Sequence, residues 1–305
     1  MEKKLNEIIK SCTPYIKTGE LASYIPELAK ADANQFGICL VQGDGVMHFA
    51  GDCDAGFTMQ SIIKPIILLL ALMDKGMEAV HRLVGVEATG KPFDAFNYSD
   101  QALQSEHINP MINTGAIALG TLVDGNSYTE KFERLLALTR KMAGNPNLDL
   151  DEKVYLSEKA TGNKNRALAY MLKAYGMLED AVEDVLDFYF RACSVKATAK
   201  DLAKIAFILA NKGKNSETGE ELFSADYARY VNAVMMTCGM YDGSGAFAVN
   251  VGVPAKSGVG GGIMAVVPDK MGIGLFSPAL DGKGNSVAGI KALELLSKEL
   301  KLSIF

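Results

Sequence analysis

The sequence predicts a mixed α/β (α+β) fold, in which both ends of the chain complete one antiparallel sheet and a helical subdomain is inserted between them. Strand-like runs flank a turn near the amino terminus, helical periodicity fills the middle of the chain, and short apolar runs broken by glycine, proline and aspartate follow residue 245. No internal repeat or low-complexity linker separates these parts. We therefore expect a single domain over residues 1–305, with a sheet layer at about 1–58 and 240–305 and a helical block at about 60–238.

The amino-terminal part predicts one helix and one hairpin. Apolar residues at helical spacing predict a helix over residues 3–17 that ends near Gly19. Residues 36–41 and 46–50 are apolar runs joined by Gln42-Gly43-Asp44-Gly45, which is a hairpin turn signal. These two strands are the amino-terminal contribution to the sheet.

The rest of the chain divides into helices and then strands. The helical candidates, each with apolar residues three and four apart, are 115–123, 129–142, 166–175, 181–192, 198–211 and 224–238. Thr198 is a predicted N-cap, because its hydroxyl can accept a bond from the first turn. The apolar runs predicted as strands are 247–251, 254–258, 262–268 and 271–277. A final helix is expected at about 285–300.

The composition excludes several classes of protein. The chain is 49% apolar and 22% charged, as is ordinary for a globular protein, and its net charge of −5 offers no basic footprint for nucleic acid. Its five cysteines are dispersed and odd in number, which favours free buried thiols in a reducing compartment over a disulfide framework. The sequence begins Met1-Glu2-Lys3-Lys4 without an apolar signal region, so we expect a cytoplasmic protein with no membrane partner.

The motif most indicative of catalysis is Ser61-Ile62-Ile63-Lys64, which is followed by Pro65. The apolar run to Met73 is too short to span a bilayer, and proline is accommodated in a first turn, so a buried helix is predicted to begin near Ser61. Positions three apart on a helix share a face, with Cβ atoms roughly 5–6 Å apart. Ser61 could then pass its proton to a neutral Lys64 in acyl transfer. The alternative is that Ser61 caps the helix and Lys64 extends to solvent.

The absence of several known motifs limits the kinds of catalysis that the sequence supports. No phosphate-binding G-x-x-x-x-G-K-[ST] and no complete G-x-G-x-x-G occur. The histidines are His48, His81 and His107, with no H-E-x-x-H, and no G-x-S-x-G elbow is present. A serine enzyme here would need a base other than histidine, and Lys64 is the residue placed for that role.

A second informative stretch is Lys256-Ser257-Gly258-Val259-Gly260-Gly261-Gly262. Its glycines would let a ligand backbone approach closely and would leave N–H groups available to an oxyanion, although a tight strand-edge turn would also need small residues. S-x-x-K followed by K-S-G matches two of the three elements of the serine β-lactamase and penicillin-binding architecture. For the middle element we favour Tyr241 over Tyr230-Val231-Asn232, which lies inside a predicted helix.

Taken together, these motifs resemble the serine-dependent glutaminases. The residues that carry the resemblance, in order over about residues 20–290, are Tyr24-Ile25-Pro26, Phe57-Thr58-Met59-Gln60-Ser61-Ile62-Ile63-Lys64-Pro65, Asn109-Pro110-Met111-Ile112-Asn113-Thr114-Gly115-Ala116, Ser157-Glu158, Asn163-Lys164-Asn165, Tyr189, Tyr241-Asp242 and Lys256-Ser257-Gly258-Val259-Gly260-Gly261-Gly262. The resemblance implies a β-lactamase/transpeptidase-like fold and hydrolysis of L-glutamine to L-glutamate and ammonia. It implies no cofactor and no metal, and a homo-oligomer, either a dimer or a tetramer.

The resemblance also implies roles for particular residues. Ser61 would be the nucleophile and Lys64 its base, with Tyr241 and Tyr24 beside the serine hydroxyl. The N–H groups of Ser61 and Val259 would form the oxyanion hole. The residues expected to hold the amino-acid end of glutamine are Asn113, Glu158, Asn165 and Tyr189.

Each of these binding residues has a purely structural alternative. Asn113 could cap the helix after Pro110, Glu158 and Asn165 could be solvated loop residues, and Tyr189 could belong to the core. Two alternative functions also stay open, a penicillin-recognising serine hydrolase of the same fold and a non-catalytic protein that binds glutamine.

Overall fold

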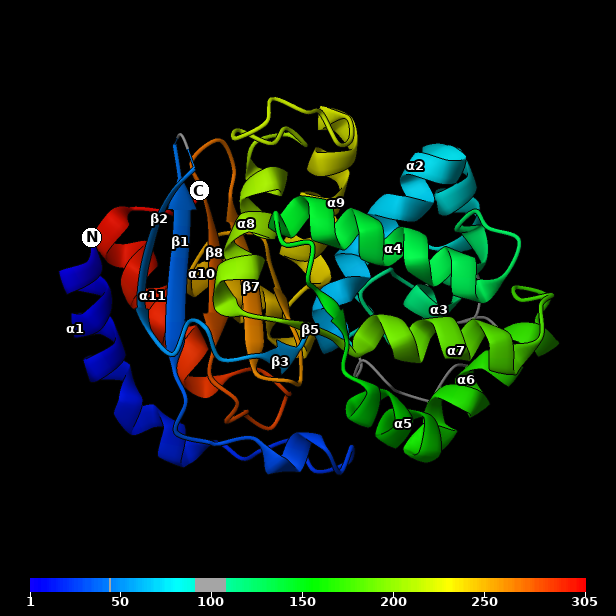
Figure 1. Cartoon of the computed structure of the whole chain (residues 1–305), viewed down its shortest axis with the longest axis horizontal. Coiled ribbons are helices and arrows are strands. Elements are labelled where there is room, and N and C mark those ends of the chain that lie inside the picture. The colour runs from blue at the N-terminus through cyan, green and yellow to red at the C-terminus, as the bar shows by residue number, and fades with distance from the viewer. Residues whose placement is uncertain (44, 91–107) are drawn as a thin grey trace.

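The computed structural model describes residues 1–43, 45–90 and 108–305. Its larger sheet has five antiparallel strands in the order β2-β1-β8-β7-β6 (Figure 1). The strands are β1 (Gly37–Gln42), β2 (Val46–Gly51), β6 (Ala255–Ser257), β7 (Gly262–Val267) and β8 (Met271–Phe276). Since β1 pairs directly with β8, the two ends of the chain complete one sheet, which confirms the predicted fold class.

The predicted hairpin is present at the start of the sheet, where β1 pairs antiparallel with β2. Leu40 lies opposite His48 on β2 and Ile273 on β8. The amide of Gly45 donates to the carbonyl of Gln42 over 3.1 Å, as a hairpin turn requires. Asp44, in the middle of the predicted turn, lies outside the described residues.

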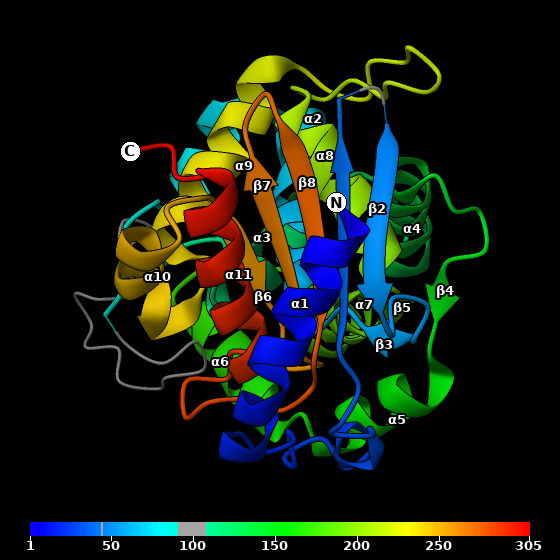
Figure 2. The same ribbon diagram turned by 90° about the vertical axis from the view of Figure 1, so that its left-hand side faces the viewer.

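One face of the sheet is covered by α1 (Glu2–Cys12), α10 (Ser244–Asn250) and α11 (Val287–Leu300). Figure 2 shows α1 and α11 lying across the strands from this side. Because side chains alternate along a strand, Leu40 and Ile273 point into this layer with Leu5 of α1 and Leu293 of α11. A 3-10 helix, Thr13–Thr18, continues α1, so the predicted helix over 3–17 is present as two helical segments.

The opposite face packs against α8 (Ala199–Ala210). A Cβ atom at Gly274 would lie 2.0 Å from the Ala199 carbonyl oxygen, so β8 and α8 approach closely only because glycine has no side chain. Thr198 caps α8 as predicted, since its hydroxyl accepts from the amide of Asp201 while the Asp201 carboxylate accepts from the amide of Thr198.

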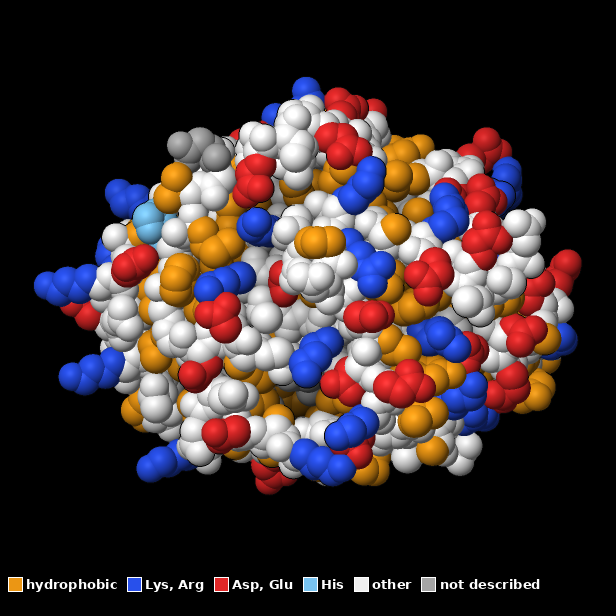
Figure 3. Space-filling view, in the orientation of Figure 1, with side chains coloured by type: hydrophobic (Ala, Val, Ile, Leu, Met, Phe, Trp, Pro, Cys, Tyr) orange, Lys and Arg blue, Asp and Glu red, His pale blue; other side chains and the backbone are white. Residues whose placement is uncertain are grey.

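The helices packed on the far side of α8 from the sheet form the inserted helical block. Its helices are α2 (Lys64–Leu83), α3 (Asn113–Leu122), α4 (Tyr128–Ala143), α5 (Glu152–Thr161), α6 (Asn163–Ala174), α7 (Val182–Cys193) and α9 (Ala225–Cys238). A small sheet in the order β3-β5-β4 lies beside them, made of β3 (Phe57–Thr58), β4 (Asp149–Leu150) and β5 (Val195–Ala197). Figure 3 shows acidic and basic side chains interspersed over this side of the molecule.

The apolar α2 is buried, as predicted. Ten of its residues, including Lys64 and Pro65, are buried, and the helix has one break at Gly76, where φ is 76°. Within residues 1–43, 45–90 and 108–305, no helix combines the length and the apolar character needed to cross a membrane.

The structure corrects one prediction and contains one helix that the sequence did not predict. Residues 247–251 were expected to form a strand, but most of them belong to α10. Phe247 and Val251 are both buried, and the Val251 amide donates to the Phe247 carbonyl, so spacing of four residues rather than of two explains the apolar run. The sequence also gave no signal for α5, whose apolar periodicity is weak.

Candidate active site

Ser61 lies at the transition between the sheets and α2. It belongs to a short 3-10 helix, Gln60–Ile63, that leads directly into α2. The serine is 6% exposed, and the preceding Gln60 has a positive φ of 50°, which is uncommon for a residue with a side chain. A strained residue immediately before a candidate nucleophile is a feature of functional sites.

The glycine-rich stretch packs against the chain that leads into Ser61. A Cβ at Gly258 would lie 2.5 Å from the Met59 carbonyl oxygen, and one at Gly260 would lie 2.4 Å from that of Thr58. These glycines therefore accommodate the protein's own backbone, whereas the sequence had suggested the backbone of a ligand. As a consequence, Val259 is held beside the segment that carries Ser61.

Two backbone amides remain available at this junction. The Gly258 amide donates to the Gly262 carbonyl over 3.1 Å, and the Gly261 amide donates to the Gly258 carbonyl over 2.9 Å. The amides of Ser61 and Val259, in contrast, donate to no residue in the described part of the chain. Unsatisfied amides in a buried place are suited to binding an oxyanion.

Lys64 lies one helical turn after Ser61 and is fully buried. Its Nζ donates to Asn113 Oδ1 over 2.7 Å and to the Met111 carbonyl over 3.3 Å. The lysine therefore does not extend to solvent, which excludes the alternative in which it was a surface residue.

Asn113 connects four helices around the site. Its Oδ1 accepts from Lys64 of α2 and, over 3.1 Å, from the hydroxyl of Tyr189 on α7. Its Nδ2 donates over 2.8 Å to Asn165 Oδ1, in the first turn of α6. Asn113 therefore does not act as a cap for α3, and Tyr189, although buried, is tied to the polar network.

Glu158 on α5 is 5% exposed, so it is not a solvated loop residue. Its Oε2 has no hydrogen-bond partner among the described residues. Burial raises the pKa of this carboxyl to about 8, while a hydrogen bond from Gln60 and the charge of Lys64 act in the opposite direction. A buried carboxylate with an unused oxygen is suited to receiving a cationic group from a ligand.

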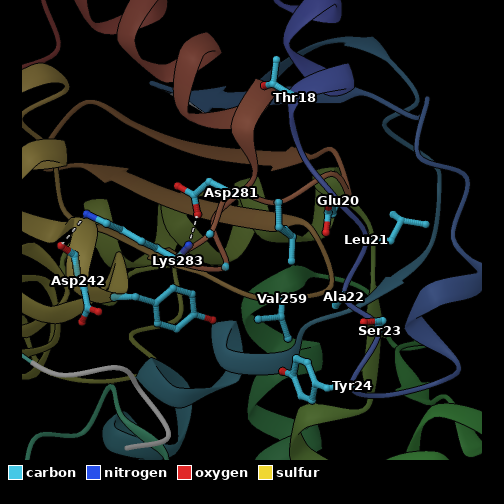
Figure 4. Close-up of a pocket in the computed structure, with 14 residues that line it drawn as sticks. Thr18, Glu20, Leu21, Ala22, Ser23, Tyr24, Asp242, Val259, Asp281 and Lys283 are labelled. Carbon is cyan, nitrogen blue, oxygen red and sulfur yellow. Dashed lines mark hydrogen bonds between the residues drawn. The ribbon is translucent and has the colours of Figure 1, made fainter.

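These side chains line a small inner cavity of about 70 Å³. Among the residues that line it are six that the sequence assigned to the site, namely Tyr24, Ser61, Asn113, Glu158, Asn165 and Tyr189. A larger outer cavity of about 730 Å³ is lined by Tyr24, Tyr241 and Val259 among others, and Figure 4 shows Tyr24 beside Val259 there. Because Tyr24 lines both cavities and is 55% exposed, it stands between the inner site and the outer one.

Tyr241 also lies beside Ser61. Its φ is 53°, burial raises the pKa of its phenol, and a hydrogen bond with Ser61 opposes that rise. The ammonium of Lys256 lies 4.3 Å from the centre of its ring. Tyr230, the alternative for this position, instead packs edge-on against His81 in the helical block.

The sequence reasoning assigned no role to several residues at the site, and of these it did not single out Cys193 at all. Gln60, Cys193 and Lys164 also line the inner cavity, and Lys256 is buried next to Tyr241. Helical spacing could have indicated Cys193, which follows Tyr189 by four residues on α7.

The geometry agrees with comparisons to known proteins. The family model described as Glutaminase matches residues 19–305. A glutaminase of Clostridium tetani is 54% identical over 305 residues and covers 100% of both chains. A glutaminase of Clostridioides difficile is 52% identical over 304 residues, which cover 100% of this chain and 98% of the relative.

Solved structures agree as well. A probable glutaminase from Bacillus subtilis, complexed with 6-diazo-5-oxo-L-norleucine, is 40% identical with a TM-score of 0.91, and the match covers 100% of this chain and 96% of that one. The fold is therefore the β-lactamase-like fold of the bacterial glutaminases, as the order of motifs predicted. With a family match over nearly its whole length and relatives more than 50% identical from end to end, the chain belongs to the glutaminase family.

Proposed function

We propose that this protein hydrolyses L-glutamine to L-glutamate and ammonia through a γ-glutamyl ester on Ser61. The observation that carries the proposal is that a buried Ser61, a buried Lys64 one turn away and a carboxylate with an unused oxygen, Glu158, meet at one inner cavity. The relatives named as glutaminases support the substrate. A Bacillus subtilis glutaminase, 39% identical, forms a covalent complex with 5-oxo-L-norleucine, which supports covalent catalysis.

In the acylation step, Ser61 Oγ attacks the γ-carboxamide carbon and its proton passes to neutral Lys64. The carbonyl oxygen becomes an oxyanion that the amides of Ser61 and Val259 stabilise. The C–N bond then breaks as Lys64 returns the proton to the departing nitrogen, directly or through Tyr241 or Tyr24, and ammonia leaves. In the second step water attacks the ester carbon and gives a proton to Lys64. The ester C–O bond then breaks as Lys64 passes that proton to Ser61 Oγ, which releases L-glutamate and restores the serine hydroxyl and the neutral lysine.

Substrate recognition follows from the charges of free glutamine. Its α-ammonium requires an acceptor, which we assign to Glu158. Its α-carboxylate requires donors, which we assign to the side-chain amides of Asn113 and Asn165 and to the Tyr189 hydroxyl, which would turn from Asn113 Oδ1 to the ligand. Tyr241 and Val259 are assigned to the γ-carboxamide. A site built from buried polar groups discriminates strongly, because a ligand that lacks the matching groups leaves them unpaired.

We also propose a single cytoplasmic domain that forms a homo-oligomer. The five cysteines are all free and buried, which supports a reducing compartment. The inner cavity is lined by Tyr24 from the amino-terminal segment and by Ser61 and Glu158 from the helical block, which supports one cooperative unit. The oligomer is supported by the family resemblance.

Ammonia release from glutamine by the wild type and by Ser61→Ala is the decisive measurement. We expect the variant to lose activity by about 10⁴-fold or more while keeping its thermal unfolding midpoint. Lys64→Ala should lose turnover similarly while still binding glutamine, with some loss of affinity because Lys64 also bonds to Asn113.

Three other outcomes would contradict the proposal. Turnover retained by Lys64→Ala would assign the base to another group. Hydrolysis of a chromogenic cephalosporin without ammonia release would favour a penicillin-recognising enzyme. Thermal stabilisation by glutamine without turnover in the wild type would favour a non-catalytic binding protein.

A further inference from the structure

The helix that carries Glu158 has little apolar surface with which to hold its place. Only Val154, Tyr155 and Glu158 are buried among the residues of α5. Helices are held in a fold mainly by burying an apolar face, so Val154 and Tyr155 alone position α5 weakly. The buried Glu158 acts against that position, because an outward movement of α5 would return its carboxyl group to water. Polar contacts are therefore needed to keep α5 where it is.

Asp187 on α7 supplies such contacts. Its Oδ1 accepts from the hydroxyl of Tyr155 and, over 2.6 Å, from Nζ of Lys159, both on α5. Its Oδ2 accepts from Nε of Arg191 over 2.7 Å, one turn further along α7. The Lys159 ammonium also donates to the Tyr155 hydroxyl over 2.9 Å. We call these four residues the Asp187 cluster.

The Asp187 cluster is partly buried and strongly hydrogen-bonded. Burial acts to raise the pKa of Asp187, but the hydrogen bonds from Lys159, Tyr155 and Arg191 outweigh it and hold that pKa below its usual range. Hydrogen bonds to an ionised group are stronger than those between neutral groups. The contact between α5 and α7 therefore depends largely on one carboxylate.

Both helices of this contact reach the inner cavity close to the cluster. Tyr155 and Lys159 flank Glu158 on α5, and Tyr155 shares a helix face with Glu158 because the two are three residues apart. On α7, Asp187 precedes Tyr189 by two residues, and Tyr189 lines the inner cavity together with Glu158. The cluster thus fixes the helix that carries Glu158 relative to the helix that carries Tyr189.

We propose that Asp187 is a positioning residue for substrate binding: it holds α5 against α7 and so keeps the carboxyl group of Glu158 at the inner cavity, where it receives the α-ammonium of glutamine. Asp187 itself lines neither the inner nor the outer cavity, so it acts only through α5. This inference rests on the proposed role of Glu158.

The test is the steady-state kinetics of Asp187→Ala. KM for glutamine should rise by about tenfold, because a small displacement of a binding group weakens its contact with the ligand. The value of kcat should stay within about twofold of the wild type, because Ser61 and Lys64 lie on other elements. The variant should remain folded, since Arg166 of α6 still donates to the Lys159 carbonyl over 2.9 Å.

Tyr155→Phe gives the same test if Asp187→Ala does not fold. This change removes only the hydroxyl that donates to Asp187 and keeps the buried ring. KM should rise by about threefold, as expected for the loss of one hydrogen bond. An unchanged KM in the folded variant would contradict the inference.

Asp74 provides a matched control away from the site. Its carboxylate is partly buried and accepts two bonds from Arg134 of α4, over 2.6 and 2.7 Å. Asp74 therefore joins two helices as Asp187 does, but it lies about 15 Å along α2 from Lys64. Asp74→Ala should lower the thermal unfolding midpoint as much as Asp187→Ala does and leave KM unchanged.

A double variant separates a positioning role from a structural one. Glu158→Gln is expected to raise KM by about 100-fold, and adding Asp187→Ala to it should change KM by less than about twofold, because the group that Asp187 positions is already lost. A further tenfold rise would show that the two residues act independently and would overturn the inference. An unchanged KM in Asp187→Ala alone would also overturn it, while Glu158→Gln with a wild-type KM would overturn the proposed binding role of Glu158 itself.

Discussion

Glu158 is the residue whose environment most clearly requires a ligand. It is 5% exposed, one of its oxygens has no partner among the described residues, and its pKa is raised to about 8 by burial. Burying a carboxylate without a partner is unfavourable, and an incoming ammonium group removes that penalty. The free site is therefore destabilised at Glu158 in a way that the α-ammonium of glutamine relieves.

This environment predicts a pH-dependent KM. Below about pH 8 Glu158 is protonated in the free protein, so binding of the glutamine ammonium must release that proton. KM should then rise by up to about tenfold for each pH unit below pH 8. Steady-state kinetics between pH 6 and 9 measure the slope. Glu158→Gln should raise KM by about 100-fold and abolish the slope, whereas a flat wild-type KM would contradict the assignment.

At the scale of elements, the turn at 258–261, between β6 and β7, and the 3-10 helix that carries Ser61 form one unit. Gly258 and Gly260 lie so close to the Met59 and Thr58 carbonyls that any side chain would separate the two segments. The position of the Val259 amide relative to Ser61 therefore depends on glycine at these positions.

Gly258→Ala should separate these two segments. We expect kcat to fall by about 10²-fold or more through loss of an oxyanion donor, and the free energy of unfolding to fall by about 1–3 kcal/mol. Gly245→Ala is the control, because Gly245 is exposed in α10 and a Cβ there would contact nothing within 4 Å. Ammonia release and urea unfolding measure both effects. Equal kcat values for the two variants would contradict the coupling.

One confirmed element and one corrected element show which local sequence patterns predict structure reliably. Thr198 caps α8 as expected, because a cap is decided within a few residues. The run at 247–251 could form either a strand or one helical turn, and the packing of Phe247 and Val251 decided in favour of the helix. Secondary-structure prediction therefore fails where a segment is too short for the spacing of its apolar residues to distinguish a helix from a strand.

At the scale of the whole molecule, the site joins parts of the chain that are distant in sequence. Tyr24 comes from the amino-terminal segment, Ser61 and Glu158 from the helical block, and Val259 from the loop between β6 and β7. A ligand bound among them should therefore stabilise the whole fold and not one local segment.

This predicts that L-glutamine stabilises the non-reacting Ser61→Ala protein. At a free glutamine concentration of 100 Kd, the free energy of unfolding should rise by about 2.7 kcal/mol. The double variant Ser61→Ala, Glu158→Gln is the control and should show almost no shift. Unfolding followed by circular dichroism checks this, and separate transitions for the sheet and the helical block would contradict a single cooperative unit.

The sequence by itself determined those features that depend on residues close to one another along the chain. The hairpin at 36–50, the buried helix after Pro65, the Thr198 cap and the helical-turn spacing of Ser61 and Lys64 all depend on residues a few positions apart. The motifs along the chain also sufficed to indicate the family and its substrate.

Only the tertiary structure decided the electrostatics and the close contacts of the site. The orphaned oxygen of Glu158, the burial of Lys256 near Lys64, and the contact of Gly258 with Met59 join segments that are up to about 200 residues apart. Burial and Coulomb interactions depend on distance in space, and a linear sequence does not contain that distance.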